Sequence, residues 1–146
     1  MTNKFKTIIE AIETKLLAAG CKRVFRYPED YGKIGNQYPF AVLKEGRQQY
    51  IATAGNRYEI DTFIIITLYG SYGTNRMERM QDLQVAVFNQ LFPDAKLAGA
   101  VANINPVTVD PGEIMTGSDI FARAGHNEAV AMREIVIQTK HYDSRR

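Results

Sequence analysis

The sequence predicts an α+β domain with a mainly antiparallel β-sheet and two α-helices packed on one face, plus a projecting hairpin and a long loop. Apolar residues recur at helical spacing in two segments, 3–19 and 75–92, and alternate at strand spacing in the segments between and after them. No repeat, low-complexity tract or linker divides the 146 residues. We therefore expect a single domain over residues 1–146.

The first helix is expected over residues 3–19, because its apolar side chains form one stripe that a core can bury. The members of this stripe are Phe5, Ile8, Ile9, Ile12 and Leu16. Gly20 follows as the expected stop. A short strand over residues 22–27 and a turn over residues 28–32 are predicted next.

The projecting hairpin is predicted between residues 44 and 58. A strand over residues 38–44 precedes it, and turn residues at Glu45–Arg47 and at 53–57 stand on either side of residues 48–52.

The strand that begins at Tyr58 is the most informative part of the chain, because both of its faces are apolar. One face carries Ile60, Thr62, Ile64, Ile66 and Leu68, and the other carries Phe63, Ile65 and Tyr69. Such a strand has to be covered twice. We expect the helices to cover one face and another copy of the chain to cover the other.

The second helix is predicted over residues 75–92, with Asn75 and Glu78 as a capping pair at its start. Its expected buried stripe contains Met77, Met80, Leu83, Val87 and Leu91. Two more strands are predicted over residues 100–110 and 128–142. The segment 111–127 between them is rich in glycine but also apolar, so we expect it to be a long loop that docks on another surface.

Candidate catalytic and metal-binding residues are few. Cys21 is the only cysteine, and we interpret it as a buried structural thiol. His126 and His141 are the only histidines, so a multi-histidine metal site is excluded. Ser118 and His126 resemble parts of a hydrolase triad, but the nucleophile-elbow motif is absent. We expect no enzyme activity, cofactor or metal, and no membrane-spanning segment.

A glycine pair at Gly70 and Gly73 marks the junction between the long strand and the second helix. Free amides at such a junction can hold an anion, but the lysine of a phosphate-binding loop is missing. We interpret the pair as a backbone hinge.

Basic and aromatic residues occur together in segments 22–27 and 47–58. In a strand, Arg23 and Phe25 point to one face and Arg26 points to the other, which splits any nucleic-acid-binding patch. We favour a protein interface or a solvated edge. A nucleic-acid-binding α+β domain is kept as the alternative from a different class, since a net charge of +2 does not decide the question.

The element order carries a resemblance to a known family. The quoted segments are AIETKLLAAG, YPFAVLK, DTFIIITLYG, MERMQDLQVAVFNQL, KLAGAVANINPVTVD and AMREIVIQTKHYD. In this order they resemble the tail-terminator, or tail-completion, proteins of long-tailed bacteriophages. Other head-to-tail adaptor and minor tail proteins share the order and stay as alternatives.

The resemblance implies a structural virion protein without a cofactor. It implies a homohexameric ring at the head-proximal end of the tail tube, which ends tube polymerisation and joins the tail to the head connector. The implied partners are other copies of the chain, the tail tube protein, a head–tail connector or neck protein, and a sheath protein if the tail is contractile. No membrane and no specific nucleic acid is implied as a partner. The implied location is the neck region of the virion, and the host cytoplasm during assembly.

The residues that we expect between copies or against the tube are large side chains with a free face, the kind that is enriched at protein interfaces. They are Arg47, Tyr50, Phe63, Ile65 and Tyr69, together with Ile114, Met115, Ile120 and Phe121 of the long loop.

Overall fold

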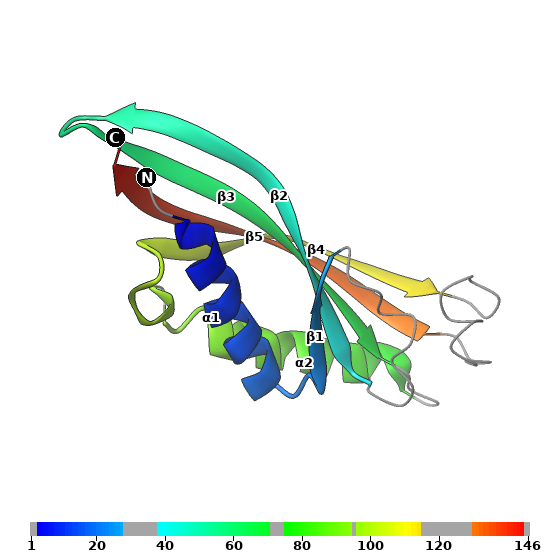
Figure 1. The fold of residues 1–146 in the computed structure, drawn as a ribbon. Helices are drawn as coiled ribbons and strands as arrows, with labels where there is room; N and C mark the ends of the chain where they lie inside the picture. The colour runs from blue at the N-terminus through cyan, green and yellow to red at the C-terminus, as the bar shows by residue number, and fades with distance from the viewer. Residues whose placement is uncertain (1–2, 28–37, 71–74, 95, 115–129, 145–146) are drawn as a thin grey trace.

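The computed structural model describes residues 3–27, 38–70, 75–94, 96–114 and 130–144, which form a helical layer on one face of a five-stranded sheet (Figure 1). The elements are α1 (Lys4–Ala18), β1 (Arg23–Arg26), β2 (Phe40–Thr53), β3 (Arg57–Gly70), α2 (Arg76–Leu91), a short 3₁₀ helix η1 (Leu97–Gly99), β4 (Asn103–Ile114) and β5 (Val130–Ser144). The predicted α+β class is confirmed.

The strand order across the sheet is β1-β2-β3-β5-β4. Strand β1 runs parallel to β2 and pairs only with Phe40–Leu43, whereas the other neighbours are antiparallel along their length. The strand predicted to be apolar on both faces is β3, and it lies in the centre of the sheet.

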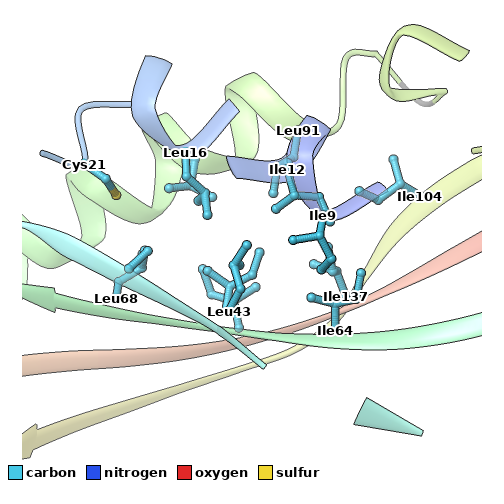
Figure 2. Packing of buried hydrophobic residues seen from close by; sticks show 14 of the residues in the cluster. Ile9, Ile12, Leu16, Cys21, Leu43, Ile64, Leu68, Leu91, Ile104 and Ile137 are labelled. Atoms are coloured by element: carbon cyan, nitrogen blue, oxygen red, sulfur yellow. The ribbon is translucent and has the colours of Figure 1, made fainter. Parts of the chain in front are cut away.

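The core lies between the sheet and the two helices (Figure 2). Ile12 and Leu16 of α1 and Leu91 of α2 pack there against Ile64 and Ile137 of the sheet. All five side chains are fully buried, so this face of the sheet is covered as predicted.

Cys21 also belongs to this core, with 4% of its surface exposed. Burial raises the pKa of its thiol to about 12, so the thiol stays protonated at neutral pH. The interpretation of Cys21 as a structural residue is confirmed.

The turn predicted at Glu45–Arg47 is wrong, because β2 continues through these residues with a β-bulge. The bulge depends on Gly46: a Cβ atom there would lie 2.7 Å from the carbonyl oxygen of Phe63 on β3. The hairpin turn lies farther on, where Gly55 and Asn56 both have positive φ angles of 84° and 63°. The predicted hairpin is therefore real, but its two strands are longer than expected.

Three further expectations need correction. Asn75 adopts a left-handed conformation with φ 54° and makes no side-chain capping bond, so the capping pair with Glu78 is absent. Met77 is 72% exposed, and the buried stripe of α2 begins at Met80. Strand β4 continues through Pro111 to Ile114, so the start of the predicted loop is a strand.

Several sequence-based expectations lie outside the described residues. They are the turn at 28–32, the glycine junction at 71–73 and the remainder of the long loop, which contains Ser118 and His126.

Replacement of Gly46 by Ala tests the bulge. We expect the free energy of unfolding to fall by about 1–3 kcal/mol, because the added methyl group meets backbone atoms of β3 that cannot rotate away. Urea denaturation followed by circular dichroism measures the change. Gly20→Ala is a useful comparison, since strain from a positive φ acts there without a steric neighbour. An unchanged stability of Gly46→Ala would contradict this role of the glycine.

Candidate functional site

The face of the sheet away from α1 and α2, which we call the open face, is the first candidate surface. Its middle contains Phe63, Ile65 and Thr67 of β3 and Val136 of β5, and all four side chains are only half-buried. Figure 1 shows both helices on the other side of the sheet. Among the described elements, no helix covers this apolar surface.

One end of the open face is covered by the chain itself. Phe40 of β2 stacks on Tyr69 of β3 with ring centroids 4.8 Å apart, and Phe25 meets Phe40 edge-on at 5.5 Å. These rings belong to a second buried cluster with Val42 and Val130. The apolar surface left for a partner is therefore the middle of the face.

The structure separates the residues predicted from the sequence as an interface. Phe63 and Ile65 lie on the open face, and the Arg47 guanidinium is 5.4 Å from the centroid of the Phe63 ring. Tyr69 is only 6% exposed within its own chain, so little of it is left for another copy. Tyr50 is 49% exposed but lies on the helix side of β2, because its partner in β3 is Ile60, whose side chain faces that way.

For the four remaining predicted interface residues, the structure describes no side chain. Ile114 ends β4, and only its backbone is described. Met115, Ile120 and Phe121 lie outside the described residues.

The open face also carries cations placed over aromatic rings, which we did not predict from the sequence. The pairs, with the distance from the cation to the ring centroid, are Arg23 and Phe25 at 4.7 Å, Lys44 and Tyr27 at 4.9 Å, Arg47 and Phe63 at 5.4 Å, and Arg57 and Tyr142 at 4.4 Å. Only the first pair has a visible sequence signal, the spacing of two residues along one strand. The others depend on strand register.

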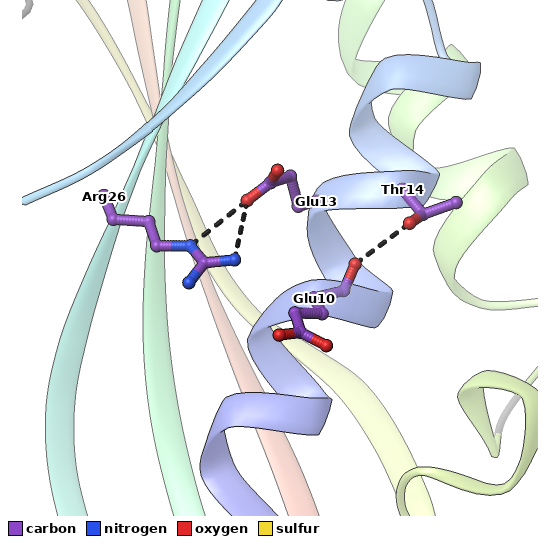
Figure 3. Close-up of polar contacts among 4 residues, drawn as sticks. All are labelled: Glu10, Glu13, Thr14 and Arg26. Carbon is purple, nitrogen blue, oxygen red and sulfur yellow. Dashed lines mark hydrogen bonds and ion pairs between the residues drawn. The ribbon is translucent and has the colours of Figure 1, made fainter.

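Arg26 shows that the basic residues of β1 do divide between two faces, as the strand alternation predicted. Its guanidinium binds the Glu13 carboxylate of α1 at 3.0 and 3.2 Å on the helix side (Figure 3). Arg23 stays on the open face over Phe25.

The opposite side of the open face carries two facing carboxylates. Asp110 of β4 and Glu134 of β5 are directly opposite each other in the sheet. Neither carboxylate has a cation partner within the part of the chain that the structure describes. Like charges at opposing positions destabilise a sheet, so a cation from outside the chain would relieve their repulsion. The open face is thus basic along β1 and the middle of β2, and it carries two facing carboxylates where β4 and β5 pair at Asp110 and Glu134. Lys140, farther along β5 on the same face, is paired with Glu59 of β3.

His141 of β5 is the second candidate, on the helix side of the sheet. It is 6% exposed, and its Nδ1 atom is buried without a hydrogen-bond partner. Burial lowers its pKa, the neighbouring Lys4 ammonium lowers it further, and the Asp143 carboxylate opposes the change. The Lys4 ammonium of α1 donates to the Tyr142 carbonyl oxygen at 2.6 Å. Its Nζ atom lies 3.9 Å from Oδ1 of Asp143.

This group does not form a recognisable catalytic centre. His141 borders two hollows, of about 580 and 310 Å³, but no nucleophilic side chain of the described residues is hydrogen-bonded to it. The described segments contain no cluster of three metal-binding side chains, and neither described helix is long and apolar enough to cross a membrane.

Comparison with known proteins gives little. No model of a protein family matches the chain, and no curated protein matches its sequence. Among solved structures, the type 4 fimbrial biogenesis protein PilO from Pseudomonas aeruginosa is similar with a TM-score of 0.37 and 13% identity, over 94% of this chain and 68% of that chain. A similarity this low carries no argument about function.

The buried imidazole predicts a specific dependence of stability on pH. The pKa of His141 in the folded chain lies below its ordinary value of 6.5, so the unfolded chain binds more protons between these two values. We expect the free energy of unfolding to be level above pH 6.5 and to fall as the pH drops below it. Urea denaturation between about pH 7.5 and pH 5 measures the effect.

Matched variants isolate the contribution of His141. In His141→Gln the loss of stability below pH 6.5 should shrink, whereas in His126→Gln it should persist. The same pH dependence in both variants would show that His141 is not its source.

Proposed function

We propose that the chain is a structural protein of a phage tail, which forms a ring at the head-proximal end of the tail tube and ends tube polymerisation. The observation that carries the proposal is the half-exposed apolar middle of the open face, formed by Phe63, Ile65 and Val136. Such a surface gains free energy when another protein surface removes it from water. The resemblance of the sequence to tail terminators is the reason for choosing this assembly.

The distribution of charge is compatible with a ring. A ring joins one patch of each copy to a different patch of the next copy. The basic side of the open face, with Lys44 and Arg47, complements the facing carboxylates of Asp110 and Glu134. Copies in the same orientation bring these opposite charges together.

A charge in the middle of the open face should weaken assembly. We expect Ile65→Glu to raise the dissociation constant of the ring by roughly tenfold or more, because burying the carboxylate between copies costs free energy. Native mass spectrometry measures the oligomer over a concentration series. Met77→Glu is the matched control, since this exposed side chain belongs to α2, which lies on the helix side of the sheet. A wild-type chain that stays monomeric, alone and with tail tubes, would exclude the ring.

The position of the protein in the phage particle needs a separate experiment. Tails assembled with the wild-type protein should have uniform length when imaged by electron microscopy. Tails assembled without it, or with Ile65→Glu, should be overlong. Uniform tails in its absence would leave an adaptor or minor tail protein as the better identity.

The four cation–aromatic pairs favour a second candidate function, the binding of single-stranded nucleic acid on the open face. This function requires an affinity for oligonucleotides that falls by orders of magnitude over a few-fold increase in salt. It also requires that Arg47→Ala reduce the steepness of that salt dependence. Fluorescence anisotropy with labelled oligonucleotides measures both, and no binding at low salt would remove this candidate.

A further inference from the structure

We propose that the free edge of β2 binds an extended peptide segment of another protein as an additional strand, in a groove between β2 and α1. This site lies on the helix side of the sheet and does not require that the chain form a ring.

No described strand pairs with the outer edge of β2 over most of its length. The last backbone bond from the β1 side runs from the Tyr27 N–H to the Leu43 carbonyl oxygen at 2.8 Å. From Lys44 to Thr53 no strand pairs with this edge within the described residues. Figure 1 shows β2 and β3 continuing together beyond β1 toward the hairpin turn.

The Leu43 bond also fixes which residues present their backbone outward. The backbone N–H and carbonyl groups of Leu43 point away from β3, so those of every second residue in the register do the same. After the bulge these positions are Glu45, Gln48, Tyr50 and Ala52, whose partners in β3 are Ile64, Thr62, Ile60 and Tyr58. Each offers one N–H and one carbonyl oxygen to an added strand.

The other edge of the sheet, β4, is protected against such pairing. Pro106 and Pro111 pair with Ile137 and Arg133 of β5. These partners are four residues apart, so the backbone groups of both prolines point to the same side of β4. A proline has no N–H to donate to β5, so the backbone at these two positions points away from β5, toward the outer edge. The outer edge of β4 thus lacks two of its donors, whereas the free part of β2 contains no proline. Among the described strands, the free part of β2 is therefore better suited than β4 to accept an added strand.

Two hollows follow the free edge on the helix side, where alternate side chains of an added strand would point. The first, of about 250 Å³, is lined by Asn3, Phe5, Lys6 and Ile9 at the start of α1 and by Arg26, Tyr27, Leu43 and Glu45. The second, of about 310 Å³, extends from β2 across β3 to β5; it is lined by Asn3, Lys4 and Phe5 at the start of α1 and by Glu45, Gln48, Tyr50, Ile60, His141 and Asp143. Both hollows include Phe5 and Glu45, so they are neighbours along the edge.

The linings indicate what the peptide carries. The first hollow has an apolar wall of Phe5, Ile9 and Leu43 beside the charged side chains of Lys6, Arg26 and Glu45, and it fits a large side chain whose apolar part packs against that wall. The second contains the Lys4 ammonium, the Glu45 and Asp143 carboxylates, and the neutral polar groups of Gln48 and Tyr50. It fits a polar side chain that donates hydrogen bonds to these acceptors, such as that of Asn, Gln, Ser or Thr, two residues from the apolar one. Backbone bonds to β2 provide affinity, and the two hollows provide selectivity.

Selection from a displayed library of random peptides of about ten residues tests the proposal on the full chain. We expect the selected peptides to share an apolar residue and an uncharged polar residue at positions i and i+2. The best synthetic peptide is then made in two N-methylated forms, with the methyl groups on alternate amides. Methylation of the amides that face β2 should weaken binding by about tenfold or more, and methylation of the others should change it little.

Hydrogen exchange locates the bound peptide without any change to the protein. The amides of Glu45, Gln48, Tyr50 and Ala52 should exchange more slowly with the peptide bound, while those of Ile104 and Val109 on the β4 edge should not change. Gln48→Pro, which removes one outward N–H, should weaken binding.

Three results would overturn the proposal. They are the absence of any selected peptide that binds, equal binding of both methylated forms, and slower exchange at β4 in place of β2. Self-association that is lost in Gln48→Pro, without peptide binding, would assign the edge to a second copy of the chain instead.

Discussion

A sheet that is apolar on both faces but covered by helices on only one is the constraint from which the rest of the structure follows. The helix side holds the core, with Ile64 and Ile137 fully buried beneath α1 and α2. On the open face, Phe63 and Ile65 are shielded only in part, by neighbouring side chains such as Arg47. Burial of apolar area dominates association between proteins, so a half-covered face of this kind favours assembly as its role.

The bulge at Gly46 determines which side chains reach which surface. An extra residue in β2 reverses the alternation beyond it. Arg47 stays over Phe63 on the open face, whereas Tyr50 turns to the helix side and lines the groove beside α1. Arg47 and Tyr50, which are three positions apart in the sequence, thus belong to two different surfaces.

Sequence patterns were sufficient for the parts of the fold that depend on periodicity. The stripe of α1, the two apolar faces of β3 and the α+β order all follow from spacing alone. The sequence predicts a turn where the structure has the bulge, because a glycine beside charged residues is typical of both. The exposure of Met77 was missed because helical spacing cannot tell where a helix extends beyond the sheet it covers.

The features of the candidate surfaces that depend on pairing between distant strands could not be predicted. Three such features require the register of the sheet. They are the position of Lys44 over Tyr27, the facing carboxylates of Asp110 and Glu134, and the outward direction of the backbone at the β4 prolines. A single sequence shows where strands are but not how they align. Phe63 and Ile65 were predicted as surface contacts only because a central strand has to have two covered faces.

Hydroxyl-radical footprinting of the protein, alone at low concentration and assembled on tail tubes, tests most directly whether the open face is the contact surface. We expect Phe63 and Ile65 to lose reactivity in the assembled state, with Met77 on α2 unchanged. Equal reactivity of Phe63 and Ile65 in the two states would contradict the account.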